Sequence, residues 1–140
     1  MTIKRLLIAN RGEIASRIIS SAHDMGISCV AIYTEADKDT PYVREADQAF
    51  KLSDSYLNSK EILDIALKSN SDAIHPGYGF LSENAAFANQ VKKLNIKWVG
   101  PSSNAIKKMG DKLTAKEIAI KANVPTLPCL LYTSDAADEQ

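Results

Sequence analysis

The segment IKRLLIANRGEIASRIISSAHDMG, residues 3–26, decides the fold, because within it an apolar run changes to helical spacing. The run IKRLLIAN leads into Arg11 and Gly12, which is typical of a buried strand that feeds a helix. Beyond Gly12 the apolar residues recur at helical spacing: Ile14, Ala15, Ile18, Ile19, Ala22 and Met25. Gly26 stands where a residue just past a helix end is expected. The segment therefore predicts a strand, a tight turn and a helix.

The same alternation continues along the chain. Further strands are expected at residues 28–33, 49–52, 72–75 and 96–100. Helices are expected at residues 41–46, 58–67, 82–94, 103–109 and 111–122, with Asn58, Ser82 and Asp111 as capping residues. Strands that alternate with helices at these lengths need βαβ crossovers. We therefore expect an α/β, Rossmann-like, three-layer domain with a mostly parallel sheet of about five strands.

Composition and charge limit the classes of partner. Of 140 residues, 45% are hydrophobic, and 17 Lys and Arg residues balance 17 Asp and Glu residues. This balance favours a small-molecule or protein partner over nucleic acid or membrane. No apolar run approaches the roughly 18 residues of a membrane span, and strand-like sequence follows Met1 too closely for a signal peptide, so a cytoplasmic protein is expected.

The two cysteines indicate no metal centre. Cys29 and Cys129 lie far apart in the sequence, without CxxC spacing or a histidine close by in the chain. Neither a zinc site nor a disulfide framework is indicated, and no metal ligand is expected on this chain. Cys29 is expected to be a core residue of its strand.

Three glycine-bearing turns mark one edge of the predicted sheet. Ligands of open α/β sheets bind beyond the carboxyl ends of the strands. Those ends carry residues 10–12, 75–79 and 100–101, which should face the same edge. A dinucleotide fingerprint is absent there, because the first turn has a single glycine and GYGFLS has Ser82 where a third glycine would stand. NAD or FAD binding is therefore not expected.

The motif HPGYGFLSEN, residues 75–84, leaves two interpretations open. Its proline and glycines fit a tight turn that leads into a helix. A turn alone does not explain His75 and Tyr78, whose polar ends need partners if they are buried, or Glu83 at a helix start. Residue chemistry alone does not choose between a structural and a functional loop.

A second candidate lies in MGDKLTAK, residues 109–116. Gly110 is expected to end one helix and Asp111 to start the next, which places Lys112 in a first helical turn. The positive end of a helix dipole and a lysine together favour an anion such as phosphate. The alternative is a solvated surface lysine.

Four stretches taken together closely resemble the amino-terminal domain of biotin carboxylase: LLIANRGEIASRI, AIHPGYGFLSENAAFA, WVGPSSNAIKKMGDK and KANVPTLP. That family provides the ATP-dependent subunit of acetyl-CoA, propionyl-CoA, methylcrotonyl-CoA and pyruvate carboxylases. In it, ATP activates bicarbonate as carboxyphosphate, and biotin captures the carbon dioxide that is released. The resemblance implies ATP, Mg²⁺ and biotin as cofactors. As partners it implies bicarbonate, the biotin carrier domain, a carboxyltransferase subunit or domain, and a second copy in a homodimer.

The resemblance also assigns roles to residues. Four residues are expected to line the cleft for biotin and bicarbonate: His75, Tyr78, Gly79 and Glu83. Lys112 is expected to contact ATP, and Arg17 to lie near a dimer interface. The catalytic residues and metal ligands of the family belong to sequence outside this chain. The chain taken alone is therefore expected to be inactive.

Three regions follow from the same resemblance. Residues 1–110 are expected to form the N-terminal, pre-ATP-grasp domain, and residues 111–128 the start of the ATP-grasp region. Residues 129–140 match nothing in this fold, and CLLYTSDAADE corresponds to the translation of a common transposon-derived sequencing adapter, so a non-native tail is expected. KLSDSYLN, residues 51–58, also departs from the family, which has a longer link there.

Two alternatives stay open. One is another ATP-grasp ligase such as carbamoyl-phosphate synthetase, against which HPGYGFLSEN followed by MGDK argues. The other is a non-catalytic binding or dimerisation module. Whether the native gene continues past Pro128 discriminates between an enzyme and such a module.

Overall fold

The computed structural model describes residues 2–121, without the side chains of residues 112–115, 117–119 and 121. The chain divides into two compact units, Met1–Ser103 and Asn104–Gln140. The expected boundaries at residues 110 and 128 remain predictions, and the tail expected at residues 129–140 lies outside the described residues.

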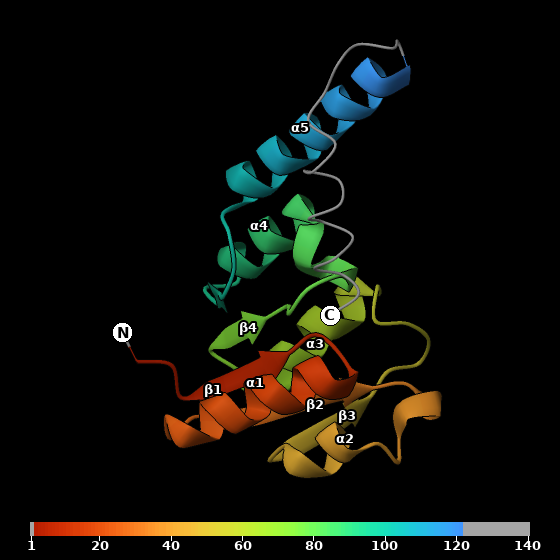
Figure 1. The fold of residues 1–140 in the computed structure, drawn as a ribbon. Helices are drawn as coiled ribbons and strands as arrows, with labels where there is room; N and C mark the ends of the chain where they lie inside the picture. Colours follow the sequence, from red (N-terminus) through yellow and green to blue (C-terminus); the bar gives the residue numbers. More distant parts are fainter. Residues whose placement is uncertain (1, 122–140) are drawn as a thin grey trace. The chain divides into compact units, whose positions relative to one another are not determined.

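A five-stranded parallel sheet forms the centre of the first unit, in the order β3-β2-β1-β4-β5 (Figure 1). The strands are β1 (Arg5–Ile8), β2 (Ser28–Tyr33), β3 (Gln48–Lys51), β4 (Ala73–His75) and β5 (Lys97–Trp98). β1 is central and pairs with β4 so that Ile8 lies beside His75. The predicted α/β, Rossmann-like fold is confirmed.

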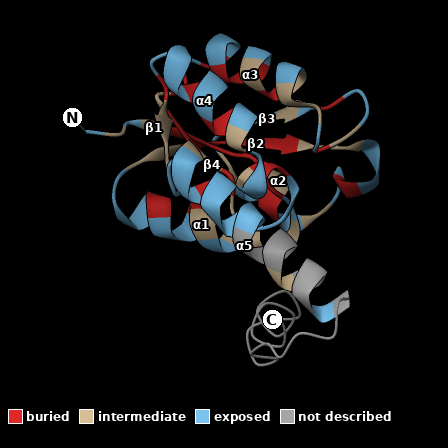
Figure 2. Cartoon of the chain, turned by 90° about the horizontal axis from the view of Figure 1, so that it is seen from above, coloured by how far each residue is buried: buried red, intermediate tan, exposed pale blue. Residues whose placement is uncertain are grey.

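Helices cover both faces of the sheet. α1 (Gly12–Asp24) and α2 (Pro41–Glu45) pack on one face, and α3 (Ser59–Lys68) and α4 (Ala85–Lys93) pack on the other (Figure 2). Neighbouring residues of β1 point to opposite faces, so Leu6 and Ile8 join the core under α1 while Leu7 joins the core under α3 and α4. Burying each such side chain stabilises the fold by about 1.5–3 kcal/mol. Cys29 is fully buried in β2, as expected.

Two helix ends follow the predicted chemistry. α1 ends at Asp24, and Gly26 just beyond it has a φ of 76°, in the region that favours glycine. α3 is capped by Asn58, whose Oδ1 accepts a hydrogen bond of 3.1 Å from the Glu61 backbone N–H. The Glu61 carboxylate does not complete a capping box but accepts the Ser53 backbone N–H at 3.0 Å. Glu61 thereby anchors the loop that departs from the family pattern.

The helix predicted over residues 82–94 begins later than expected. Ser82 lies within a 3₁₀ helix, η2 (Phe80–Glu83), and α4 starts only at Ala85. Asn84 is the cap, because its Oδ1 accepts the Phe87 backbone N–H at 2.9 Å. The positive φ of 45° at Phe80 starts a tight 3₁₀ turn that displaces the α-helix start by three residues from Ser82 to Ala85.

The predicted break at Gly110 is wrong. A single helix, α5 (Ser103–Lys121), runs through Gly110 and Asp111, so Asp111 is not an N-cap. A glycine that ends a helix needs a positive φ, and Gly110 does not have one. Glycine inside a helix costs only about 0.5–1 kcal/mol relative to alanine, which is too little to force a break.

Among the described residues, no helix has the length and apolar character needed to cross a membrane.

Candidate functional site

The three glycine-bearing turns meet at one edge of the sheet, as predicted. β1, β4 and β5 are adjacent and parallel, so the turns that follow Ile8, His75 and Trp98 leave the sheet in the same direction. The third turn is fixed by a hydrogen bond of 2.8 Å from Trp98 Nε1 to the Pro101 carbonyl. This edge is where ligands of parallel α/β sheets bind.

Asn10 joins the first turn to the HPGYGFLSEN loop. Its buried Nδ2 donates to the carbonyls of Pro76 at 2.9 Å and Tyr78 at 2.7 Å. Its Oδ1 accepts the Arg11 backbone N–H at 2.8 Å. Gly77 lies so close that an added Cβ would stand 2.6 Å from Asn10 Nδ2. One amide side chain therefore holds the loop, and only glycine fits beside it.

The loop presents its polar residues to solvent. Gly77, Gly79 and Phe80 have φ values of 65°, 70° and 45°, which turn the chain sharply away from β4. Tyr78 is 49% exposed and Glu83 is exposed, so neither needs a buried partner. The Phe80 ring packs 5.4 Å from the Tyr56 ring, which fixes the far end of the loop. The loop is thus both a tight turn and an exposed, ordered surface.

His75 is less exposed than Tyr78 and Glu83. Its ring is partly buried, and Nδ1 accepts the Gly77 backbone N–H at 3.0 Å. This bond requires a lone pair on Nδ1, so the neutral ring carries its proton on Nε2. Burial lowers the pKa of His75 and favours the same neutral form.

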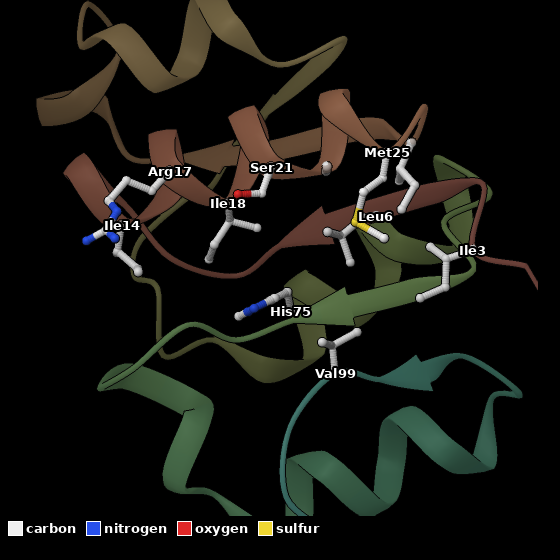
Figure 3. Close-up of a pocket in the computed structure, with 11 residues that line it drawn as sticks. Ile3, Leu6, Ile14, Arg17, Ile18, Ser21, Met25, His75 and Val99 are labelled. Carbon is white, nitrogen blue, oxygen red and sulfur yellow. The ribbon is translucent and has the colours of Figure 1, made fainter.

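His75 lies instead in an apolar cavity on the α1 face. The cavity has a volume of about 430 Å³, and Figure 3 shows Ile14, Arg17 and Ile18 of α1 facing His75 and Val99 across it. Arg17 is exposed at its edge. The structure therefore brings Arg17 and His75 to one cavity, while Tyr78 and Glu83 lie on the exposed loop.

A polar network around the buried Asp37 carboxylate supports the first turn. Arg11 forms a bidentate pair with Asp37, with Nε–Oδ2 and Nη2–Oδ1 distances of 2.6 Å. Tyr56 Oη donates to Asp37 Oδ2 at 2.6 Å, and Tyr42 Oη donates to the Ile32 carbonyl at 2.9 Å beside it. Arg11 and Tyr56 lower the pKa of Asp37, while burial raises that of Tyr42. The network fixes Arg11 next to Asn10.

Sequence reasoning missed both Asn10 and this network as parts of the site. The sequence pattern places Asn10 in a turn without a role in the site, and Asp37 belongs to no motif. The signal that could have found them is a polar residue directly after a buried strand, since it must find partners on neighbouring strand ends.

The sequence matches a known domain family. The model for the biotin carboxylase N-terminal domain matches residues 2–106. This chain belongs to that family. Biotin carboxylase 1 of Bacillus subtilis is 53% identical over 131 residues, covering 90% of this chain and 29% of the relative. The alpha subunit of mitochondrial methylcrotonoyl-CoA carboxylase from Dictyostelium discoideum is 48% identical over 131 residues, covering 90% of this chain and 19% of the relative.

Solved structures of biotin carboxylase domains share the fold. The biotin carboxylase domain dimer of Hydrogenobacter thermophilus 2-oxoglutarate carboxylase, in complex with MgADP, ADP and bicarbonate, superposes with a TM-score of 0.79 at 43% identity, covering 91% of this chain and 29% of that chain. The complete pyruvate carboxylase of Rhizobium etli gives a TM-score of 0.79 at 35% identity, covering 91% and 14%. The chain spans less than a third of the length of the curated relatives named here.

Lys112, the residue expected to contact ATP, lies on α5 of this biotin carboxylase N-terminal chain. Its backbone belongs to α5, but its side chain lies outside the described part of the chain. Because α5 continues through Gly110, Lys112 does not stand in a first helical turn, and the dipole argument for an anion there fails. Its contact with ATP stays a prediction that rests on the family resemblance.

Proposed function

We propose that the chain is the N-terminal part of an ATP-dependent biotin carboxylase, a ligase that carboxylates biotin on its carrier protein with bicarbonate. The observation that carries the proposal is the Asn10 side chain, which holds the exposed HPGYGFLSEN loop at the ligand-binding edge of the sheet. Relatives named as carboxylases of several different substrates share this domain. Such breadth fits a domain that serves the common biotin step rather than substrate selection.

In this proposal the loop lines the cleft for biotin and bicarbonate. Tyr78 and Glu83 offer an exposed hydroxyl and an exposed carboxylate, and an added Cβ at Gly79 would meet no atom within 4 Å. Open space beside a glycine lets a ligand approach the backbone closely. His75 Nδ1 accepts a hydrogen bond from the Gly77 backbone N–H. His75 therefore acts, together with Asn10, as a residue that positions the loop.

The HPGYGFLSEN loop by itself does not suit Mg²⁺. Magnesium needs near-octahedral oxygen ligands, of which one or two are carboxylates. On the HPGYGFLSEN loop Glu83 is the one carboxylate, and the Asp37 carboxylate near the first turn is engaged by Arg11 and Tyr56. The proposal therefore places the magnesium ligands outside this chain. ATP with Mg²⁺ supplies the phosphoryl group that activates bicarbonate.

The remaining partners are proposed from the resemblance to the biotin carboxylase family. Lys112 is proposed to contact ATP, and Arg17, exposed on α1, to lie at a homodimer interface. A biotin carrier domain and a carboxyltransferase subunit or domain are the further proposed partners. The resemblance assigns the catalytic residues of the family to sequence outside residues 1–140, so we also propose that the chain alone is inactive.

A chimera tests the proposal. Residues 1–110 would replace the matching part of Bacillus subtilis biotin carboxylase 1, which is 53% identical in the region matched. We expect ADP release that depends on both bicarbonate and biotin. Within the chimera, Tyr78→Phe or Glu83→Gln should lower kcat/KM for biotin by about tenfold, the effect of one lost hydrogen bond. The matched control, Lys60→Gln at an exposed position of α3, should leave it unchanged.

A chimera that folds and releases no ADP would contradict the proposal and favour a non-catalytic module. Activity that is equal in the loop variants and the control would contradict the cleft-lining role alone.

A further inference from the structure

Three potential metal ligands meet at the edge of the sheet opposite the proposed cleft. His23 lies in the last turn of α1, Cys29 lies near the start of β2, and Asp47 directly precedes β3. Their ligand atoms, an imidazole nitrogen, Sγ and a carboxylate oxygen, all lie within 4.8 Å of one another. Spacing along the chain does not reveal this cluster, because the three residues match no zinc motif. Parallel pairing of β2 with β3 brings them together.

Asp47 already contacts the other two residues of this cluster. Asp47 Oδ2 accepts the Cys29 backbone N–H at 2.7 Å and lies 2.8 Å from His23 Nε2. The fully buried Cys29 Sγ has only weak contacts, 4.0 Å to the Ile19 carbonyl and 3.9 Å to the Ile27 carbonyl. The side chains of His23 and Asp47 are 39% and 47% exposed. The buried Cys29 thiol thus lies beside the partly exposed side chains of His23 and Asp47, which can change rotamer.

We propose that His23, Cys29 and Asp47 form a binding site for Zn²⁺. Thiolate, imidazole and carboxylate are the three protein ligand types that zinc takes in tetrahedral sites. Bond lengths of about 2.0–2.3 Å place neighbouring ligand atoms roughly 3.3–3.6 Å apart in such a site. The His23–Asp47 contact must therefore widen slightly from 2.8 Å, and the other separations must close from at most 4.8 Å. Side-chain rotations of the two exposed residues can provide both changes.

Zn²⁺ binding at this site would release one proton, from the Cys29 thiol. Burial, with the Asp47 carboxylate second, raises the pKa of the Cys29 thiol to about 11, so the free protein holds it protonated. When Zn²⁺ binds, the S–H bond breaks, the proton leaves to solvent and a Zn–S bond forms. The dication then lies between a thiolate and a carboxylate, which repel one another without it. A water molecule can take the fourth position on the side where His23 and Asp47 are exposed.

Zinc at this site would join α1, β2 and β3. An ion that binds the folded chain and not the unfolded one raises the stability of the folded chain. The competing interpretation is a plain hydrogen-bonded pair, in which Asp47 orients a histidine at the carboxyl end of α1. The two differ in whether Cys29 Sγ becomes a ligand.

Metal titration of the 140-residue chain distinguishes them. Cys129, which lies outside the described residues, is replaced by serine throughout so that Cys29 is the only thiol. Co²⁺ is the spectroscopic probe, because thiolate coordination gives a charge-transfer band that oxygen and nitrogen ligands do not. Zn²⁺ affinity follows from competition with Co²⁺ and from the rise in unfolding temperature.

We expect one equivalent of Co²⁺ to give the thiolate band and Zn²⁺ to remove it. Cys29→Ala should abolish the band, and His23→Gln should weaken Zn²⁺ binding at least tenfold. Asp64→Asn, an exposed carboxylate on α3, is the matched control and should change neither. Circular dichroism verifies that the variants fold. No thiolate band in the folded parent, or equal Zn²⁺ affinity in the parent and the His23 and Cys29 variants, would overturn the proposal.

Discussion

Gly77→Ala should destabilise the fold strongly, because it acts on the contact that holds the loop. The added methyl would stand 2.6 Å from Asn10 Nδ2 at a backbone φ of 65°. An alanine in the left-handed region costs about 1–2 kcal/mol. Displacing Asn10 from the Pro76 and Tyr78 carbonyls removes two hydrogen bonds, each contributing about 0.5–1.5 kcal/mol. The expected loss in the free energy of unfolding is therefore about 2–5 kcal/mol.

Gly79→Ala is the matched control for this substitution. Gly79 has a φ of 70°, but no atom lies within 4 Å of an added Cβ. Its ψ of −165° is a conformation that essentially only glycine adopts, so alanine there should lose about 1–3 kcal/mol through backbone strain and no hydrogen bond. Urea unfolding of the full chain measures both variants. In an Asn10→Ala background the excess loss at Gly77 should disappear, since the hydrogen bonds that it breaks are already gone. A loss at Gly77 that stays the same in the Asn10→Ala background would refute the role given to Asn10.

Three further predictions follow from individual contacts. Asn84→Ala should lower the stability of the fold by about 1 kcal/mol, and Ser82→Ala by much less, because Asn84 caps α4; equal effects in urea unfolding would contradict this. Asp37→Asn should cost about 2 kcal/mol at neutral pH, since Arg11 is half-exposed and screened. Arg11 lowers the pKa of Asp37, so the Asp37 carboxylate stabilises the fold above its ordinary pKa of 3.8. This stabilisation is lost as the pH falls through the lower pKa of the folded state. The free energy of unfolding of Asp37→Asn should therefore fall less steeply toward acid pH than that of the parent chain. His75 should titrate below its ordinary pKa of 6.5 in NMR spectra, and a midpoint at or above that value would contradict its buried, neutral state.

The order of strands and helices was predictable because the apolar pattern is local. β2 and the start of α1 follow directly from an apolar run and from helical spacing. The errors lie where one residue type fits two roles. Gly110 can end a helix or continue one, and only its φ decides. Ser82 and Asn84 are both good caps, and the 3₁₀ turn before α4 selects Asn84.

The site was predictable only in part, because its contacts join distant positions. The edge that carries HPGYGFLSEN follows from strand order, which the motif and the βα alternation imply. The contact of Asn10 with residues 76 and 78, and that of Arg11 with Asp37, depend on which strands are neighbours. The cluster of His23, Cys29 and Asp47 has the same origin. Spacing along the chain contains none of this information.

The expected tail at residues 129–140 has an independent test in the source DNA. Amplifying and sequencing the gene beyond the codon for Pro128 should show a glycine codon and an ATP-grasp region in place of CLLYTSDAADE. The same codons continuing into a full carboxylase gene would contradict an adapter origin. A stop after Gln140 would favour the binding module.

The most direct test of the central claim compares the isolated chain with the Bacillus subtilis chimera in one assay, ADP release that depends on bicarbonate and biotin. If the chain is the N-terminal part of a biotin carboxylase, the isolated chain should show no such release and the chimera should show clear release. A chimera that folds but stays inactive, or an isolated chain that turns over by itself, would contradict it.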